Sequence, residues 1–515
     1  MRPITDSSHR ERASFLTRRD LLKAGAATAA AWAIPGILPA REDDPPSGGR
    51  RKPNIVVILA DDMGFSDISL FGSEIPTPNI DRIGNEGMVF ERFFNCAKCV
   101  PTRGSLMTGV QPHAVGAAGT GGGLLKPCVT LPEVLKAAGY RTGIAGKWHL
   151  KCDLLQRGFD EGLFVPLRGG IKDYHDPGPL VLDGKPLPAA RKDRDFHMTD
   201  ALNDYGIEFV RKHARSRSPF FLYLAHFAPH WAMQQDGLTG QAREEDYRRF
   251  EDTYRDGYKA ARQRRMQNQR RLGLSDVPEG FAPLSCETPW DALSPEQQRK
   301  TAVQMANHAG LVHGLDRGIG RLLAALADEG IEQDTMVVFL SDNGASPEKS
   351  GFGPGWASAS CTPLRFYKKH VEEGGISTPL LVRWPRRIPR GRRTAAMGHV
   401  MDWMATCLDM TGATYPEVRA GQKMPPLQGR SLLPVFAGQK TSPHDHLCFE
   451  YKGACAVRTE KWKAVGGKGG RAWQLYDMTA DRAEQKDVSA QHPEILRRLK
   501  GLFEYWKKNG FTHKV

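Results

Sequence analysis

The chain carries short runs of continuous apolar residues, each of which ends abruptly in polar side chains. Residues 54–59 read NIVVIL and lead into ADDMG, and comparable runs lie within 139–150, 219–231 and 334–346. Short unbroken apolar runs rich in β-branched residues are typical of strands buried on both faces of a parallel sheet. The pattern therefore predicts four buried strands, each followed directly by polar residues.

Helical patterns separate these predicted strands. Residues 131–139 form one, and the longest spans 299–330, where apolar side chains recur at helical spacing. Strands that alternate with helices predict an α/β fold, in which ligands bind beyond the carboxyl ends of the strands. We expect this catalytic α/β domain to occupy residues 53–439.

The pattern changes after about residue 440. HLCFEYKGACAVRTEKWKAVGG and AWQLYDM alternate as antiparallel strands do, and HPEILRRLKGLFEYWKKNG has the spacing of an amphipathic helix. Residues 440–515 are therefore predicted to form a smaller α+β domain, an antiparallel sheet with a helix, packed against the first domain.

The N-terminal residues predict export. TRRDLLKAGAATAAAWAIPGILPA holds paired arginines followed by an uncharged, alanine-rich run, the pattern of a twin-arginine signal peptide over residues 1–40. A membrane span is the alternative, but 17 mostly small residues with two prolines make a poor one. We expect residues 41–52 to be a disordered leader. The mature protein should be soluble, in the periplasm or secreted, after passage through the twin-arginine export machinery.

The charge of the chain suits an acidic partner. The formal net charge is +14 at pH 7, which is equally compatible with nucleic acid and with sulfated or phosphorylated polymers. The sequence has no zinc-finger or RNP-type motif, and we interpret the basic stretch 262–271 as a solvated helix face. We therefore expect no nucleic-acid partner.

Oxygen-bearing side chains follow two of the predicted strands. Asp61 and Asp62 follow residues 54–59, and Asp342 with Asn343 follows the strand within 334–346. These ligand types suit a hard cation such as Ca²⁺ or Mg²⁺. An aspartate after a strand also commonly caps the next helix, so a single one would be a weak indication. Two such pairs at two strand ends favour a metal site.

Five cationic or titratable residues would surround these acids: Arg103, Lys147, His149, His230 and Lys368. Together with a divalent metal they would hold a tetrahedral oxyanion, such as sulfate or phosphate. Each of the motifs that contain the histidines also has a purely structural explanation when it is considered alone. GKWH would be a turn with a buried tryptophan, and PH would be a loop histidine whose ring forms a hydrogen bond with a backbone carbonyl.

Cys96 and Cys99 stand at the spacing of a redox pair or half a zinc site. No thioredoxin-like context surrounds them, and Cys99 opens the segment CVPTRGSLMTG. This segment resembles the first signature of the sulfatase family, Cys-x-Pro-x-Arg with a Thr-Gly ending. GYRTGIAGKWHL, residues 139–150, is similar to the second signature.

The agreement extends through PNIVVILADDMGFSD, TPNIDRIGNEG, FFLYLAHFAPHW and FLSDNG over roughly residues 53–510. It is closest to bacterial arylsulfatase-like members of the family. The resemblance implies an alkaline-phosphatase-like fold, with a central mixed sheet between helices and a small C-terminal subdomain. It also implies a sulfuric ester hydrolase that acts on an aryl or carbohydrate sulfate ester, sulfated polysaccharide included.

In that family the cysteine at the position of Cys99 is oxidised to formylglycine (3-oxoalanine) by a separate maturation enzyme before the chain folds. One hydroxyl of the hydrated aldehyde attacks sulfur while the ester oxygen leaves, as other activated nucleophiles do. The second hydroxyl then loses its proton, sulfate is released and the aldehyde returns. Cys96 would be a bystander.

The resemblance also implies roles for the site residues. Arg103 and Lys147 would hold the oxygens of the diol, and His149 would take the proton of its second hydroxyl. The implied ligands of Ca²⁺, or alternatively Mg²⁺, are Asp61, Asp62, Asp342, Asn343 and the residue derived from Cys99.

His230 and Lys368 would bind sulfate, and one of them would protonate the leaving oxygen; Lys369 is the neighbouring alternative to Lys368. Asp342 would assist deprotonation of the nucleophile. Ser377 stands where many relatives carry arginine, which puts only the periphery of the substrate site in doubt.

Two other functions stay open. One is a phosphonate or phosphate ester hydrolase of the same superfamily with the same nucleophile, because sulfate and phosphate esters are close in shape. The other is a non-catalytic glycan-binding protein with a relic site. The loop 166–188 and the insertion 233–300 are expected to shape the outer pocket, but nothing in them indicates a particular sugar.

Overall fold

The computed structural model describes residues 52–511 except 120, 167–169, 179, 188–195, 233–239, 275–276, 279, 281–287 and 349–350. The predicted signal peptide, nearly all of the predicted leader, and parts of the loop 166–188 and the insertion 233–300 lie outside this described part. Within it, we find no helix that combines the length and the apolar character needed to cross a bilayer.

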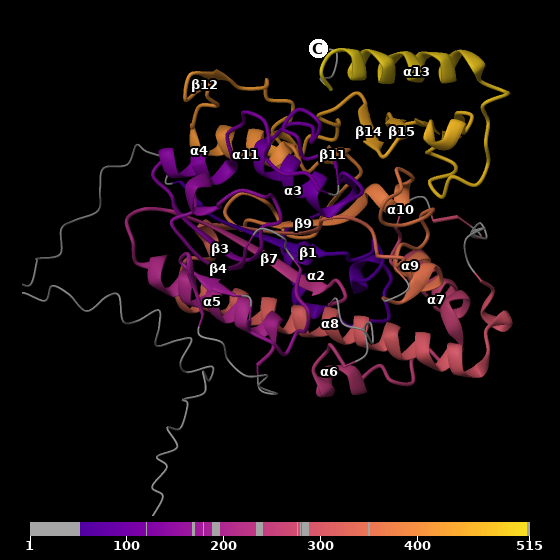
Figure 1. Cartoon of the computed structure of the whole chain (residues 1–515), viewed down its shortest axis with the longest axis horizontal. Helices are drawn as coiled ribbons and strands as arrows, with labels where there is room; N and C mark the ends of the chain where they lie inside the picture. Colours follow the sequence, from indigo (N-terminus) through magenta and orange to yellow (C-terminus); the bar gives the residue numbers. More distant parts are fainter. Residues whose placement is uncertain are drawn as a thin grey trace, which may run out of the picture.

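A mixed sheet of 11 strands forms the centre of the molecule, in the order β10-β2-β9-β8-β1-β7-β3-β4-β5-β6 with β11 paired to β2 (Figure 1). The strands β8, β1, β7, β3 and β4 run parallel, and β9 is antiparallel to both of its neighbours. The predicted α/β fold is confirmed. The strands are β1 (Asn54–Asp61), β2 (Met88–Phe94), β3 (Arg141–Lys147), β4 (Glu161–Val165), β5 (Val181–Leu182), β6 (Lys185–Pro186), β7 (Phe220–Pro229), β8 (Thr335–Ser341), β9 (Ser377–Arg383), β10 (Arg392–Thr394) and β11 (Gly398–His399).

Strand β1 shows why the predicted strands are unbroken apolar runs. Val56 and Ile58 join the core on one face of the sheet, whereas Ile55 and Val57 join the core on the other. Helices cover both faces, so consecutive side chains of the strand are all removed from water. Figure 1 shows α5 and α8 on one side of the sheet, and α3, α4 and α11 on the other.

The helices of the large domain are α2 (Pro78–Asn85), α3 (Cys99–Thr108), α4 (Leu131–Ala137), α5 (Met198–Ala214), α6 (Glu244–Arg248), α7 (Gly257–Arg271), α8 (Pro295–Asp328), α9 (Gly353–Ser360), α10 (Glu373–Ile376), α11 (Asp402–Thr411) and α12 (Leu433–Phe436). The long predicted helix is α8, and it begins earlier than residue 299. Ser294 caps it: the Ser294 hydroxyl accepts the Gln297 N–H at 3.2 Å, and the Gln297 side chain accepts the Ser294 N–H.

The basic stretch 262–271 lies in α7, as predicted, but it is not simply a solvated face. Arg262 and Arg265 are buried. Arg265 forms ion pairs with Asp67 at 2.7 Å and Glu74 at 2.9 Å, which compensate its charge away from water. The interpretation was wrong for these two arginines because the periodicity of a sequence does not reveal which charged side chains the rest of the fold covers.

A second sheet, antiparallel and four-stranded, lies near the C-terminus, where α13 (Pro493–Lys508) packs against it (Figure 1). Its strands are β14 (Leu447–Tyr451), β15 (Ala454–Arg458), β16 (Trp462–Gly466) and β17 (Gln474–Asp477). A short hairpin of β12 (Val418–Arg419) and β13 (Gln422–Lys423) precedes it. The expected sheet-plus-helix subdomain is thus present.

A buried group of charges joins this subdomain to the large domain. Glu373, at the start of α10, pairs with Lys463 of β16 at 3.1 Å and with Arg482 at 3.5 Å, and Lys463 also pairs with Glu484 at 2.9 Å. Buried ion pairs of this kind demand fixed geometry, because an uncompensated partner would be costly. Ser377 belongs to this group, since its hydroxyl donates to Glu373 at 3.2 Å. It lies where the large domain contacts the C-terminal subdomain.

Candidate active site

The carboxyl ends of four neighbouring parallel strands bring the predicted site residues together. In the order β8-β1-β7-β3, each strand ends in or next to one of them. Asp61 lies opposite Pro229, the residue before His230, and Ala60 lies opposite Ser341, the residue before Asp342. Parallel strands place their carboxyl ends on the same edge, which is why residues far apart in the sequence meet here.

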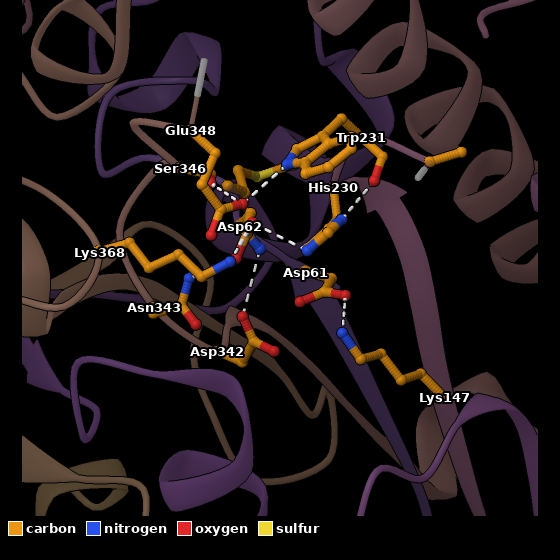
Figure 2. Close-up of polar contacts among 12 residues, drawn as sticks. Asp61, Asp62, Lys147, His230, Trp231, Asp342, Asn343, Ser346, Glu348 and Lys368 are labelled. Carbon is orange, nitrogen blue, oxygen red and sulfur yellow. Dashed lines mark hydrogen bonds and ion pairs between the residues drawn. The ribbon is translucent and has the colours of Figure 1, made fainter. Parts of the chain in front are cut away.

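Three buried carboxylates lie together in this site. Asp61, Asp62 and Asp342 each place an oxygen within 4.8 Å of the other two, and all three side chains are buried. Asp62 adopts a left-handed conformation, with φ of 64°, and its Oδ1 accepts the Asn343 amide at 2.6 Å. Figure 2 shows these side chains converging on one point.

The donor set fits a hard divalent cation. Asp61 Oδ1 and Asn343 Oδ1 are buried and accept no hydrogen bond from any residue of the described part. Burial and the neighbouring Asp61 also raise the pKa of the Asp342 carboxyl to about 7. Clustered oxygen ligands that lack donors and repel one another are what a bound Ca²⁺ or Mg²⁺ would compensate.

Three cations pair with these acids one by one. Lys368 Nζ donates to Asp62 Oδ2 at 2.6 Å, Lys147 pairs with Asp61, and Arg103 donates to Asp342 Oδ2 at 2.8 and 3.1 Å. Burial opposes ionisation of Asp61 and Asp62, but these cations hold the pKa of both carboxyls below its usual value. With all three carboxyls ionised, as metal ligands are, three negative and three positive charges cancel, so a divalent cation would leave a surplus of +2 that attracts an anion.

Cys99 is the first residue of α3, and Arg103 follows one helical turn later on the same face. Both are buried, at 1% and 0% exposure. Arg103 also donates to the Lys147 carbonyl at 2.8 Å, which ties α3 to the end of β3. Cys99 is thereby held beside the acids and cations of the sheet edge.

Cys96 faces away from this site. Its sulfur lies 3.7 Å from His399 Nε2, and its backbone N–H donates to the Thr102 hydroxyl at 2.9 Å. None of the cysteines in the described part forms a disulfide. A redox pair of Cys96 with Cys99 is therefore absent from this structure.

The two histidines differ in their surroundings. His230 Nδ1 lies 2.6 Å from the Trp231 carbonyl, so that nitrogen carries the proton and Nε2 points toward Asp62 Oδ2 at 3.4 Å. Burial lowers the pKa of His230 although Asp62 opposes the shift. Burial, Lys147 and Arg103 lower the pKa of His149 to about 2, and its Nδ1 has no hydrogen-bond partner among the described residues. His149 is thus a neutral imidazole with a free nitrogen.

The neighbouring lysines are clearly distinguished. Lys368 is fully buried against Asp62, whereas the Lys369 side chain is 39% exposed and pairs with Glu348 at 2.8 Å. Lys368 therefore belongs to the site and Lys369 to its rim.

Sequence reasoning missed Glu348 and Trp231 at that rim. Glu348 Oε2 accepts the Trp231 indole N–H at 2.8 Å and the Ser346 hydroxyl at 2.9 Å, and the Trp231 ring lies nearly parallel to that of His230 (Figure 2). Both lie in loops just past a strand. In the sequence, the position of Trp231 directly after His230 could have indicated that Trp231 lies at the site. Nothing comparable indicated Glu348.

Known proteins resemble this chain along most of its length. The sulfatase family profile matches residues 53–413, and the profile of the N-sulphoglucosamine sulphohydrolase C-terminal region matches residues 364–508. An uncharacterised sulfatase of Schizosaccharomyces pombe is 31% identical, with 88% of this chain and 93% of that protein covered. An arylsulfatase of Klebsiella aerogenes is 30% identical, with 75% and 92% covered. The crystal structure of Ps i-CgsB in complex with k-i-k-neocarrahexaose superposes with a TM-score of 0.68 at 27% identity, covering 90% of this chain and 95% of that one.

The fold and the edge-of-sheet site are those of a sulfuric ester hydrolase in the alkaline phosphatase superfamily. The chain belongs to the sulfatase family.

Proposed function

We propose that this sulfatase cleaves its ester with a formylglycine derived from Cys99, assisted by one divalent cation. The observation that carries the proposal is the position of Cys99, buried at the start of α3 beside Arg103 and the three carboxylates. A maturation enzyme would have to supply the oxidation. A thiol could not complete the cycle by the elimination described above, because that step needs two hydroxyls on one carbon.

The cation would be held by Asp61, Asp62, Asp342 and Asn343 with the residue derived from Cys99. Oxygen ligands without histidine or cysteine favour Ca²⁺, with Mg²⁺ as the alternative. Once bound, it would polarise a sulfate oxygen and compensate the charge that develops on it.

The remaining side chains would act on protons and on charge. Arg103 and Lys147 would stabilise the nucleophilic oxygens, and neutral His149 would accept the proton that the second hydroxyl loses. Lys368 would bind sulfate from its buried position. His230 would act in its doubly protonated form: Nδ1–H donates to the Trp231 carbonyl, and Nε2–H would give its proton to the leaving oxygen. The Asp62 carboxylate favours this charged form.

For the substrate we propose a sulfated carbohydrate in preference to a simple aryl sulfate. The support is that a structural relative at 27% identity was crystallised with k-i-k-neocarrahexaose, an oligosaccharide by its name. The alternative within the superfamily, a phosphate or phosphonate ester hydrolase, predicts faster turnover of aryl phosphate than of aryl sulfate. The glycan-binding relic predicts turnover of neither.

We also propose that the mature enzyme acts outside the cytoplasm. The support for export is the pair Arg18 and Arg19 before the alanine-rich run. Fusing residues 1–52 to a reporter and replacing both arginines with lysine tests it. Export that continues unchanged in the substituted fusion contradicts a twin-arginine signal.

Mass spectrometry of the peptide that holds residue 99 tests the central claim. In protein produced with a maturation enzyme, one oxygen should replace sulfur and two hydrogens, and aryl sulfatase activity should rise in proportion to that fraction. Full activity in protein that contains only unmodified cysteine would overturn the proposed mechanism. Parallel assays with aryl sulfate and aryl phosphate separate the two hydrolase functions.

A further inference from the structure

Tyr451, the last residue of β14, is a buried tyrosine of the C-terminal sheet in the same apolar cluster as the chain segments next to Cys99 and Lys368. It is 2% exposed, and it packs in one apolar cluster with Ala97 and Val371. Ala97 lies two residues before Cys99, and Val371 lies three residues after Lys368. The Lys369 N–H donates to the Ala97 carbonyl at 2.9 Å, so these two segments lie side by side. Burial raises the pKa of the Tyr451 hydroxyl to about 12, and its electrostatic neighbours include Lys368 and Glu348.

This hydroxyl has no hydrogen-bond partner among the described residues. A buried hydroxyl left unpaired costs free energy, and phenylalanine would fill the same space without that cost. Groups of this kind persist where a ligand uses them, because binding then supplies the missing partner. The hydroxyl is therefore an available donor next to the catalytic residues.

Lys98 supplies a second available donor. It lies directly before Cys99 and is half-buried. Its backbone carbonyl accepts the Thr102 N–H at 3.0 Å, but its side-chain ammonium forms no hydrogen bond or ion pair with any residue of the described part. Its electrostatic neighbours include the same two residues, Lys368 and Glu348. The nearby carboxylates are already occupied: Asp62 pairs with Lys368, and Glu348 accepts from Lys369, Trp231 and Ser346.

We propose that Lys98 and Tyr451 form a subsite for a second anionic oxygen group of the substrate, a sulfate or a carboxylate carried near the scissile sulfate ester. Two donors that lack acceptors, one of them a cation, match such a group in hydrogen bonding and in charge. The subsite would give a substrate with two anionic groups an advantage over one with a single sulfate. This inference rests on the proposed function, and it makes the C-terminal subdomain part of the substrate site.

The test compares wild-type enzyme with Tyr451→Phe and Lys98→Met, each corrected for its formylglycine content at residue 99. The substrates are 4-nitrophenyl sulfate and pairs of sugar sulfates that differ only in a second sulfate or in a carboxylate. Wild type should prefer the doubly anionic member of at least one pair by about 10-fold or more in kcat/KM. Each variant should lose about 10- to 100-fold on that member, mainly through KM, and far less on 4-nitrophenyl sulfate. Separate arms with sulfate and carboxylate identify which anion is bound.

Two control variants distinguish an effect on substrate binding from an effect on the stability of the fold. Tyr140→Phe removes a tyrosine hydroxyl that does have a partner, the Pro53 carbonyl at 2.9 Å, at the opposite end of β3 from the site. It should lower Tm, whereas Tyr451→Phe should leave Tm unchanged or raise it. Lys212→Met removes an exposed lysine that pairs with Glu161, and it should not alter the preference within any pair.

Three results would overturn the proposal: no preference for a doubly anionic substrate, an equal loss on all substrates in both variants, or a Tm of Tyr451→Phe well below wild type. Calorimetry with Cys99→Ser protein measures the affinities for the doubly and singly sulfated sugars directly. It therefore tests the subsite without turnover. If matured wild type hydrolyses no sulfate ester at all, the proposed function fails, and this binding measurement still tests the subsite.

Discussion

Arg103 of α3 and Asp342 at the end of β8 are joined by two hydrogen bonds, of 2.8 and 3.1 Å, from one guanidinium to one carboxylate oxygen. Both side chains are fully buried. The same guanidinium reaches the Lys147 carbonyl. A single residue thereby fixes the position of the helix that begins with Cys99 relative to two strands of the sheet.

This geometry predicts that Arg103→Lys is not a conservative change. Lysine keeps the charge but cannot make the planar fork that contacts Asp342 and the Lys147 carbonyl together. We expect kcat on an aryl sulfate to fall by about 10²–10³-fold, the usual loss when one charge-stabilising donor is removed. Activity must be divided by the formylglycine fraction, because Arg103 lies in the same signature segment as Cys99 and its replacement can change how much of residue 99 is converted. Near-normal corrected activity would contradict the assignment.

Metal binding should stabilise the protein as well as activate it. We expect chelation to lower Tm and abolish turnover, and Ca²⁺ to restore both more effectively than Mg²⁺. A cation at 100 times its Kd contributes about 2.7 kcal/mol to the free energy of unfolding. Asp61→Asn should lose this calcium-dependent stabilisation. Asp252→Asn, at an exposed aspartate paired with Arg255, should keep it. Stoichiometric zinc in active protein would refute the ligand assignment.

The role of His230 can be read from a series of leaving groups. As a general acid it would matter little for a nitrophenolate and greatly for a sugar alkoxide, because only the alkoxide needs protonation to leave. His230→Ala should therefore reduce kcat/KM for a sugar sulfate about 10²–10⁴-fold and for an activated aryl sulfate much less. His230→Gln keeps a polar side chain but cannot transfer the proton, so it should behave like alanine. An unchanged dependence on leaving-group pKa would assign the acid role to Lys368.

A pH-dependent stability is expected from Asp67, which accepts from Arg265 at 2.7 Å and from His308 at 3.0 Å. Burial opposes its ionisation, but His308 and Arg265 lower its pKa to about 2 from its ordinary value of 3.8. Because the folded-state pKa is depressed, this stabilisation is present above pH 3.8 and is lost as the pH falls through about 2.

Asp67→Asn should therefore lower the free energy of unfolding at pH 7 by about 3–5 kcal/mol, the usual cost of breaking a buried ion pair. The deficit should shrink as the pH falls below 3.8, where the carboxyl of the unfolded chain takes up its proton. Urea unfolding of both proteins at pH 7, 5 and 3.5 measures it. A deficit of the same size at pH 3.5 would show that the carboxylate charge is not responsible.

The sequence allowed the central strands and the acidic edge of the sheet to be predicted because both follow local rules. β1 is apolar at every position since helices cover both faces, and parallel strands must end together, which brings Asp61 and Asp342 to one point. The sulfatase resemblance then named the cations between them.

The contributions of Glu348, Trp231, Lys98 and Tyr451 could not be predicted in this way. The position of each of these residues depends on how a loop or the second sheet packs against the first sheet. Packing of this kind leaves no periodic pattern in the sequence. Arg262 and Arg265 were misjudged for a similar reason, since only the folded chain brings Arg265 to Asp67 and Glu74. Local patterns specify the elements and their ends, whereas contacts between distant segments determine which polar residues are buried.

If a separate enzyme converts Cys99, the burial of this residue sets a time limit on the production of active enzyme. At 1% exposure in α3, its side chain is out of reach of another protein's catalytic centre once the fold has closed. If residue 99 is matured by a separate enzyme, oxidation competes with folding for each newly made chain. Chains that fold first are stable, correctly shaped and permanently inactive. Specific activity would then depend on how synthesis rate compares with the supply of maturation enzyme, so slower expression should yield fewer molecules but a larger active fraction.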